Sequence, residues 1–557
     1  MRNPLEGAST NRRNFLGLVG LGAASVAGGG LLSGCSKDPG TSGSATTAEQ
    51  AAGVVPTFKD STLVQPDVKG VRPMADGYVK YPTTLVDGVT DKAVTSGKPV
   101  TATTPWWGPA PPTSNKLVEA VNADMGAVIN FSIQDGVTYG DKLNTMLGAR
   151  DVPELTCIPG WEINKLARFS EGVHVLFEDL TPHLSGDKVN AYPLLAGLDT
   201  KAWNDSVWGG KLMGVPFPTD SPYPTVLFYR KDVTDQRGIA APTTLDEVYD
   251  FGKKMTNPDK GEWAFGDIFQ EVLQICGNTG SQNGWAKAAD GKVYHRYETP
   301  EYARAVEFMT RLYAEKLIHP DLASTKGGDV KTLFKGGKIF MFADGGGAWK
   351  EVWRPAVQIT PTFNMQAVKV FGADKGKPPV RWQGTPSIMW TFIKKDLGQE
   401  RVQELLRVLN YTAAPFGTKE WELQNYGVEG THFKRDASGA PVTNDLYVKE
   451  FANQFIFLGG RPPVVVGGPD IPSYAKDFVT WGNDAAQYLE KNPWEGIKVE
   501  VPSEQAAIQQ PTDDKITDIQ RGRRPLSDLP KVVDEWRAGG GDAARDFYAK
   551  VLADNGR

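Results

Sequence analysis

The sequence predicts an α/β protein of two lobes, with mostly parallel central sheets and a hinge between the lobes. Three observations support this fold class. From residue 99 onward, short β-rich runs alternate with helical runs, which is typical of parallel sheets with right-handed crossovers. The chain has 557 residues, more than one hydrophobic core normally holds. A proline-broken stretch over 216–224 separates the two halves.

The composition is that of an ordinary soluble globular protein. Hydrophobic residues make up 40% of the chain and charged residues 23%, and the formal net charge is −5. Binding to a nucleic acid needs a concentrated basic surface, which this charge disfavours. Only five histidines occur, with no pair four residues apart and none in a cysteine cluster, so we expect no transition-metal site. The sequence leaves open whether a structural Ca²⁺ is present.

The first 35 residues resemble a bacterial export signal with a lipid-attachment site. Asn11-Arg12-Arg13-Asn14-Phe15-Leu16 is similar to a twin-arginine motif, and an apolar run over 16–32 follows it. Departures at Asn11 and Gly17 leave the export route open between twin-arginine and general secretion. Leu32-Ser33-Gly34-Cys35 resembles a lipobox, which implies acylation of Cys35 and attachment to the extracytoplasmic face of the cell membrane. An uncleaved anchor is disfavoured because the run is short and glycine-rich.

Residues 36–97 are predicted to lie outside the two lobes. The segment 36–56 is made of small and polar residues, the composition of a flexible tether. The segment 57–97 is polar, and proline and glycine interrupt it without a clear period. We therefore expect a tether followed by a peripheral extension.

The first lobe is predicted to begin at residue 98 with alternating strands and helices. β-rich runs over 100–104, 128–133 and 154–158 enclose helical patterns over 114–125 and 139–147. In open sheets of this kind, ligands bind beyond the carboxyl ends of the strands. Tryptophans follow two of these ends, at positions 106, 107 and 161.

The stretch 203–232 is predicted to connect the lobes. Its prolines fix φ and lack an N–H donor, so 217–224 cannot lie in the middle of a sheet. We expect an extended crossover that serves as the hinge, followed by a strand over 225–229. The next helix begins at a capping box, Thr244-Leu245-Asp246-Glu247.

The remaining elements complete the predicted division into lobes. A helix over 299–313 starts with proline in its first turn, a strand near 338–341 is expected to return to the first lobe, and a helix over 399–410 opens the final portion. The first lobe would comprise 98–219 and 338–394. The second lobe would comprise 220–337 and 395–557, including helices at the C-terminus.

The order of motifs along the chain resembles the solute-binding proteins of ABC importers, specifically the large sugar-binding lipoproteins. The matching residues are Trp203, Gly210-Lys211, Gly214-Val215-Pro216, Phe228-Tyr229-Arg230-Lys231-Asp232, Gly238-Ile239, Pro242, Thr244 and Glu247. The resemblance covers roughly residues 98–555. It implies a two-lobed periplasmic-binding-protein-like fold, a carbohydrate ligand, favoured as an oligosaccharide, and an ABC permease as partner. It also implies a monomer without a cofactor.

Sugar recognition suggests which residues form the site. The C–H faces of a sugar pack on aromatic rings, and its hydroxyls bond to carboxylates, amides and arginine. We expect about half of the following residues to touch the ligand: Trp106, Trp107, Trp161, Glu162, Asp220, Tyr223, Asp267, Asp344, Trp349, Trp382 and Gln383. Trp106 and Trp107 should point in opposite directions, one to the ligand and one to the core.

Several alternatives accompany this interpretation. Asp344-Gly345-Gly346-Gly347 lacks the further glycine of a dinucleotide fingerprint, because position 350 is lysine, so we favour a glycine turn. Cys157 and Cys276 are expected to be two separate thiols, with a disulfide between them left open. A secreted glycan-active enzyme, similar to a glycoside hydrolase, and a surface adhesin or sensor are alternative functions. No catalytic motif occurs, and we predict a binding protein without catalytic residues.

Overall fold

The computed structural model describes residues 45–89, 96–163, 165–166, 169–280, 284–323, 330–500 and 503–557. The chain divides into Met1–Gly40 and Thr41–Arg557, and all described residues belong to the second unit. The twin-arginine motif, the lipobox and Cys35 lie outside the described residues. In the described part of the chain, no helix combines the length and the apolar character needed to cross a bilayer.

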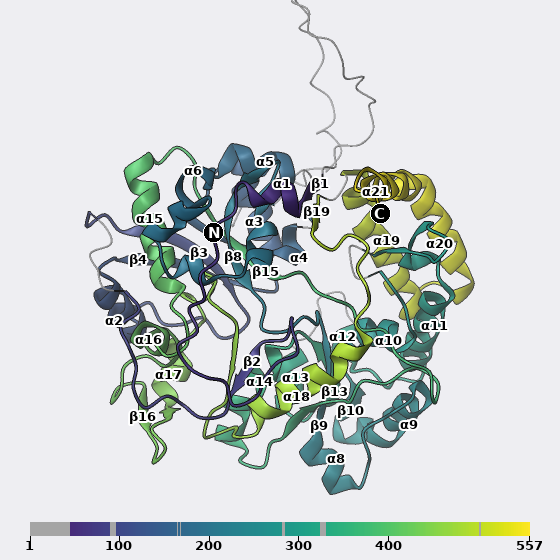
Figure 1. Ribbon diagram of the computed structural model, residues 1–557. Coiled ribbons are helices and arrows are strands. Elements are labelled where there is room, and N and C mark those ends of the chain that lie inside the picture. Colours follow the sequence, from purple (N-terminus) through teal and green to yellow (C-terminus); the bar gives the residue numbers. More distant parts are fainter. Residues whose placement is uncertain are drawn as a thin grey trace, which may run out of the picture. The chain divides into compact units, whose positions relative to one another are not determined.

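A five-stranded sheet forms the centre of the first lobe (Figure 1). β4, β3 and β5 pair in parallel, whereas β15 pairs antiparallel with both β5 and β8. Four strands therefore run in one direction, and β15 runs in the other. The strand order is β4 (Ile129–Asp135), β3 (Val100–Trp106), β5 (Leu155–Pro159), β15 (Ser387–Ile393) and β8 (Gly214–Pro218).

A four-stranded sheet forms the centre of the second lobe. β13 pairs in parallel with β10 and antiparallel with β9, and β9 pairs antiparallel with β14. Most strands of each sheet thus share one direction, as predicted, and each sheet also contains one reversed strand, which the sequence did not reveal. The order is β10 (Trp263–Phe265), β13 (Ile339–Asp344), β9 (Val226–Arg230) and β14 (Met365–Ala367).

Each reversed strand follows a crossing between the sheets. β8 ends at Pro218, and the chain enters the second sheet as β9; β14 ends at Ala367, and the chain returns to the first sheet as β15. The predicted proline-rich crossover is present, although β8 continues through Pro216 and Pro218. β8 tolerates these prolines because it is the edge strand of its sheet, where an absent N–H removes no bond to a neighbouring strand.

The lobe boundaries predicted from the sequence require correction. Within 338–394, β13 and β14 belong to the second sheet, and only β15 belongs to the first. α15 (Gln399–Thr412) and α16 (Lys419–Tyr426) contribute Leu405 and Tyr426 to the core of the first lobe, not of the second. The apolar pattern identifies a buried strand or helix, but it carries no information about which sheet that element joins.

The segment expected to be peripheral is built into the body of the protein. β2 (Asp76–Tyr78) pairs in parallel with β18 (Val464–Val466), and Met74 is fully buried. Met74 packs on Gly482 of α18 (Tyr474–Ala485), where a Cβ would lie 2.7 Å from the sulfur of Met74. The tether also contributes a strand, since β1 (Ala45–Thr47) pairs antiparallel with β19 (Ile497–Val499).

The C-terminal helices close the core of the second lobe. Tyr548 stacks on Trp285 with ring centroids 5.2 Å apart, and Trp536 packs on Trp285 at a tilt with ring centroids 5.8 Å apart. Figure 1 shows these helices side by side at the C-terminal end of the chain. They are α19 (Ser503–Gln520), α20 (Leu529–Trp536) and α21 (Asp542–Asp554).

The two described cysteines are both free. Cys157 is buried in β5 of the first lobe, and Cys276 follows α10 (Phe269–Ile275) in the second. Burial raises the pKa of each thiol to about 12, so both stay protonated at neutral pH and are poor nucleophiles. The expectation of two separate thiols is confirmed.

A buried ion pair holds the second crossing against the start of β9. Arg381 Nη1 donates to Glu271 Oε2 of α10 at 2.7 Å, and Nη2 donates to the Thr225 carbonyl at 2.6 Å. The two charged side chains are only 3% and 4% exposed. Because charges buried this deeply depend on each other, removal of one leaves the other uncompensated.

We expect Arg381→Met to lower the free energy of unfolding by about 3–5 kcal/mol, because it leaves Glu271 buried without its partner. Urea unfolding followed by circular dichroism measures the loss. The matched control is Arg304→Met, which breaks the exposed pair between Arg304 and Asp374 and should leave the midpoint almost unchanged. Equal effects of the two substitutions would contradict the structural role of the buried pair.

Candidate functional site

The carboxyl edges of the two central sheets meet at the crossings. β8 leaves the first sheet at its carboxyl edge, and the reversed strand β9 begins at the carboxyl edge of the second. Only residues 219–225 lie between them, a length that spans at most about 25 Å. Residues at the ends of the parallel strands in both lobes therefore lie on the same side of the molecule as the hinge.

Three tryptophans that were predicted to contact the ligand lie at the carboxyl edge of the first sheet. Trp106 ends β3, Trp107 follows it, and Trp161 lies in the short helix α4 (Gly160–Ile163) after β5. Trp107 lies 5.8 Å from Trp161 between ring centroids. Trp161 is 40% exposed, which is unusual for so large an apolar ring. The parallel pairing of β3 and β5 brings these rings together from distant parts of the sequence.

Trp106 and Trp107 do point to different partners, as their adjacency predicts. Trp106 Nε1 donates to the Pro109 carbonyl at 3.0 Å, whereas the Trp107 ring contacts Phe457 at 6.3 Å. A Cβ at residue 136 would lie 2.3 Å from the Trp107 ring, so glycine is required there. Both tryptophans are half-buried, which corrects the expectation that one of them faces the core.

Glu162 is part of the support for this edge. Its side chain is buried and lies 3.4 Å from Lys165 Nζ. The carboxylate packs against Gly140 in the first turn of α3 (Tyr139–Ala149), where the positive end of the helix dipole favours an anion. This environment orients α4 and leaves little of Glu162 for a ligand.

Two predicted aspartates lie at the corresponding edge of the second lobe. Asp344 ends β13, is half-buried, and lies 3.6 Å from Lys331. Asp267 follows β10, is exposed, and accepts a hydrogen bond from the Phe269 N–H at 3.0 Å. Because β10 and β13 are parallel neighbours, both carboxylates lie at the strand ends, facing the side where the crossings run.

Asp220 lies in the first crossing, with basic side chains around it. It is half-buried, and its carbonyl accepts a hydrogen bond from the Ala75 N–H at 3.1 Å. Burial raises the pKa of its carboxyl group, while the charges of Lys350 and Arg461 act in the opposite direction. Neither cation is among the ligand contacts predicted from the sequence. They come from segments distant in the sequence, and no motif connects them.

Three predicted contacts are wrong, because the structure places them in the core of the second lobe. Tyr223, Trp349 and Trp382 are 3%, 1% and 4% exposed. Their polar atoms already donate to protein carbonyls: Tyr223 to Gly482, Trp349 to Met365 and Trp382 to Asn278. A ring with neither a free face nor a free donor cannot contact a sugar. Gln383, in the second crossing, is half-buried and remains a candidate ligand contact.

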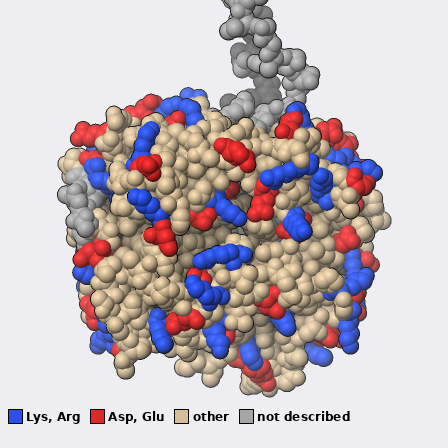
Figure 2. All heavy atoms as spheres, viewed as in Figure 1, with Lys and Arg blue, Asp and Glu red and all other residues tan. Residues whose placement is uncertain are grey.

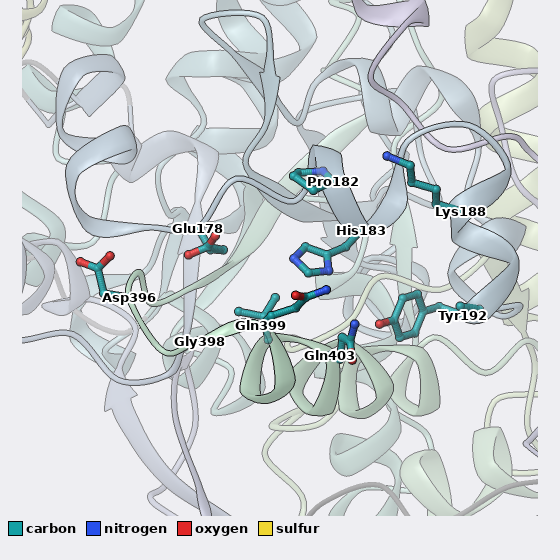
Figure 3. Close-up of a pocket in the computed structure, with 11 residues that line it drawn as sticks. Glu178, Pro182, His183, Lys188, Tyr192, Asp396, Gly398, Gln399 and Gln403 are labelled. Atoms are coloured by element: carbon teal, nitrogen blue, oxygen red, sulfur yellow. The ribbon is translucent and has the colours of Figure 1, made fainter.

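A cavity lies elsewhere, at the opposite edge of the first sheet (Figure 3). It has a volume of about 560 Å³. The Glu178 N–H donates to the carbonyl of Ile393, which pairs with Leu155 at the amino end of β5. In Figure 3, His183, Gln399 and Gln403 face this space from α6 (Thr181–Leu184) and the start of α15. No predicted site residue lines it.

Two further features bear on the site: the charges on one face of the molecule and the arrangement of potential metal ligands among the described residues. Figure 2 shows acidic and basic side chains intermixed over one face of the molecule, which is hollowed near its middle. Among the described residues, no group of three or more His, Cys, Asp and Glu side chains is placed to hold a metal ion. The aromatic edge and the charged crossing together form the candidate site.

Two sheets joined at their carboxyl edges, each with one reversed strand, define a two-lobed periplasmic-binding-protein-like fold. The sequence matches the family described as bacterial extracellular solute-binding protein over residues 109–395. The chain belongs to this family.

Relatives and solved structures agree with this membership. The chain is 22% identical over 434 residues to the polygalacturonan/rhamnogalacturonan-binding protein YtcQ of Bacillus subtilis (strain 168), covering 74% of this chain and 83% of YtcQ. It is 22% identical over 456 residues to lipoprotein LipO of the same organism, covering 78% and 88%. The fold is similar to that of NgtS, the N-glycan transport solute binding protein from Streptococcus pneumoniae, in complex with Man5GlcNAc. The TM-score is 0.60 at 15% identity, covering 82% of this chain and 99% of NgtS.

We expect tryptophans of the site and of the core to respond differently to truncation. Trp161→Ala should change the free energy of unfolding by less than about 1 kcal/mol, because the ring is partly exposed. Trp349→Ala should cost about 3–5 kcal/mol, because it opens a cavity in the core. Urea unfolding monitored by circular dichroism tests both. A loss at Trp161 as large as that at Trp349 would show that Trp161 is structural.

Proposed function

We propose that this protein is the substrate-binding component of an ABC importer and that it captures an oligosaccharide between its lobes. The observation that supports this most directly is the group of tryptophan rings at the carboxyl edge of the first sheet, with Trp161 40% exposed. Aromatic faces of this kind match the C–H faces of sugar rings. The family to which the chain belongs consists of extracellular binding proteins.

The proposed ligand contacts come from both lobes. Trp106, Trp107 and Trp161 would form the apolar wall, and Asp267 and Asp344 would accept hydrogen bonds from hydroxyl groups across the gap. Asp220 and Gln383, one in each crossing, would contribute polar groups at the base. A ligand that contacts both walls favours the closed arrangement of the lobes, because closure adds contacts that the open arrangement lacks.

The comparisons support a glycan as the ligand. YtcQ is named for binding polygalacturonan and rhamnogalacturonan, and NgtS was solved with Man5GlcNAc. These ligands are all carbohydrates built from several sugar units. A long edge with several tryptophans suits such a chain, since each ring can pack against one sugar unit.

We expect the protein to bind oligosaccharides of more than one sugar unit and to return them intact. Isothermal titration measures binding, and chromatography of the recovered ligand tests for cleavage, which would reveal a glycan-active enzyme. Trp161→Ala should weaken binding about tenfold or more, because a stacking face is lost. The matched control is Trp263→Ala, in β10 at the far end of the second sheet. Failure to bind any glycan would refute the proposal.

Attachment to the membrane is a second part of the proposal. Cys35 would carry lipid chains at the mature N-terminus, and each buried CH₂ contributes about 0.8 kcal/mol to membrane binding. The relationship to lipoprotein LipO supports this. The anchor would keep the captured sugar near the permease.

Substitution of the lipidation site tests the anchor. In bacterial cells that process lipoproteins, the unaltered protein should enter the detergent phase on phase separation with Triton X-114. Cys35→Ala should remain in the aqueous phase, because no thiol is left to acylate. Cys157→Ala is the matched control, since it removes a buried thiol and should not change the partition. Detergent partition of C35A equal to that of the unaltered protein would contradict lipidation at this residue.

A further inference from the structure

Three charged side chains from three different segments approach one another at the base of the two lobes. Asp220 lies in the first crossing, Lys350 in α14 (Ala348–Ile359), and Arg461 follows the turn Gly459-Gly460. Asp220 interacts electrostatically with both cations. All three are half-buried, so they are surrounded by protein and still reached by solvent.

Tight backbone contacts hold these segments together. Gly460 lies so close to β8 that a Cβ there would overlap the Pro216 carbonyl oxygen, and a Cβ on Gly346, just before α14, would lie 3.4 Å from Ser221. The chain ahead of Arg461 therefore rests on the end of β8, and the start of α14 rests on the first crossing. The charged groups occupy positions determined by packing and not by flexible loops.

Among the described residues, the charges of this group are compensated only in part, because one carboxylate faces two cations. In the described part of the chain, no ion pair involves Lys350, Arg461 or Asp220. Arg461 Nη2 donates to Asn425 Oδ1 at 2.9 Å, but Nη1 is buried without a hydrogen-bond partner. Neighbouring Arg354, by contrast, pairs with Asp470 at 3.1 Å. With all five groups ionised, three cations face two carboxylates, which leaves an excess of one positive charge.

Leaving such groups unpaired is unfavourable for the ligand-free protein. Burial and the nearby charges of Arg354 and Arg461 lower the pKa of Lys350 well below its usual value, and burial lowers the pKa of Arg461 to about 10. Unpaired buried charges cost free energy and are retained mainly where function requires them. An anionic group from outside would supply the missing partner.

The face of α14 that carries Lys350 points away from the core of the second lobe. Trp349 and Trp353 bury the other face. Arg354, one turn after Lys350, lies 5.5 Å from the ring of Tyr426, which belongs to the core of the first lobe. Lys350 and Arg354 therefore project from the second lobe toward the first.

We propose that Lys350 and Arg461 bind a carboxylate of the captured sugar, so that the protein selects an acidic oligosaccharide built from uronic acids. Asp220 would accept a hydrogen bond from a hydroxyl group of the same sugar unit. This inference rests on the proposed function and names the ligand class for the same site. The arginine offers a planar pair of donors that matches a carboxylate, and the lysine offers a compact charge beside it.

A neutral sugar would leave the positive charge of this site without an anionic partner. Its hydroxyls can accept hydrogen bonds from Lys350 and Arg461, but they do not neutralise the excess charge when the lobes close and water leaves. We therefore expect a large difference in affinity between an acid and its neutral counterpart of equal shape.

Pairs of ligands that differ only in charge test the inference. Trimers of galacturonate, glucuronate and mannuronate are compared by isothermal titration with their methyl esters, which keep the sugar skeleton and remove the charge. The full-length mature protein should bind at least one acid ten to one hundred times more tightly than its ester. Equal affinity for acid and ester in every pair, or tighter binding of the esters, would overturn the inference.

Substitutions test which residues distinguish the acidic sugar from its methyl ester. Lys350→Met and Arg461→Gln should each reduce affinity for the acid at least tenfold and change affinity for the ester little. Lys254→Met, at an exposed position of α9 (Leu245–Met255), makes the same change in net charge and should leave both affinities unchanged. Equal losses for acid and ester in K350M would also count against the inference.

Stability separates a ligand-binding role from a structural one. Because Lys350 is an unpaired and partly desolvated cation, K350M without ligand should unfold at the same or a higher urea concentration than the unaltered protein. A K350M protein that unfolds earlier and still distinguishes acid from ester would overturn the inference. Acid selection and the proposed function can be refuted separately. Binding of neutral glycans alone refutes acid selection, whereas no binding of any glycan refutes the proposed function.

Discussion

The two crossings between the sheets are the constraint on which the rest of the structure depends. Each enters its new sheet as a reversed strand, so both leave and arrive at carboxyl edges. This arrangement places the ends of the parallel strands of both lobes on one side. Trp107 and Trp161 from the first lobe, and Asp267 and Asp344 from the second, thereby share a common region although they are far apart in sequence.

The charged side chains around the first crossing differ in how they are paired. Arg381 and Glu271 neutralise each other in the interior behind it, and Arg354 and Asp470 form a pair beside it. Asp220, Lys350 and Arg461 have no such arrangement among the described residues. Among the described residues, the charges behind and beside the crossing are paired, whereas Lys350 and Arg461 share the single carboxylate of Asp220.

Much of the fold follows from local patterns in the sequence. Alternating strands and helices, the capping box at Thr244 and the prolines after β8 predict two α/β lobes and a hinge, and the order of motifs indicates the family. The positions of Trp107 and Trp161 follow because parallel strands end at one edge. Lobe membership of β13 could not be predicted, since apolar periodicity records burial and not strand pairing. Trp349 was misassigned because its residue type does not distinguish a ring in the core from one that contacts a ligand. Lys350 and Arg461 had no local signal.

The parallel pairing of β2 with β18 gives the N-terminal segment a role in the architecture of the mature protein. Met74 fills a space that Gly482 leaves open in α18, and Tyr78 packs on Phe416 of the first lobe with ring centroids 4.8 Å apart. A shortened protein beginning at residue 98, where the sequence pattern predicts the start of the first lobe, would expose both contact surfaces.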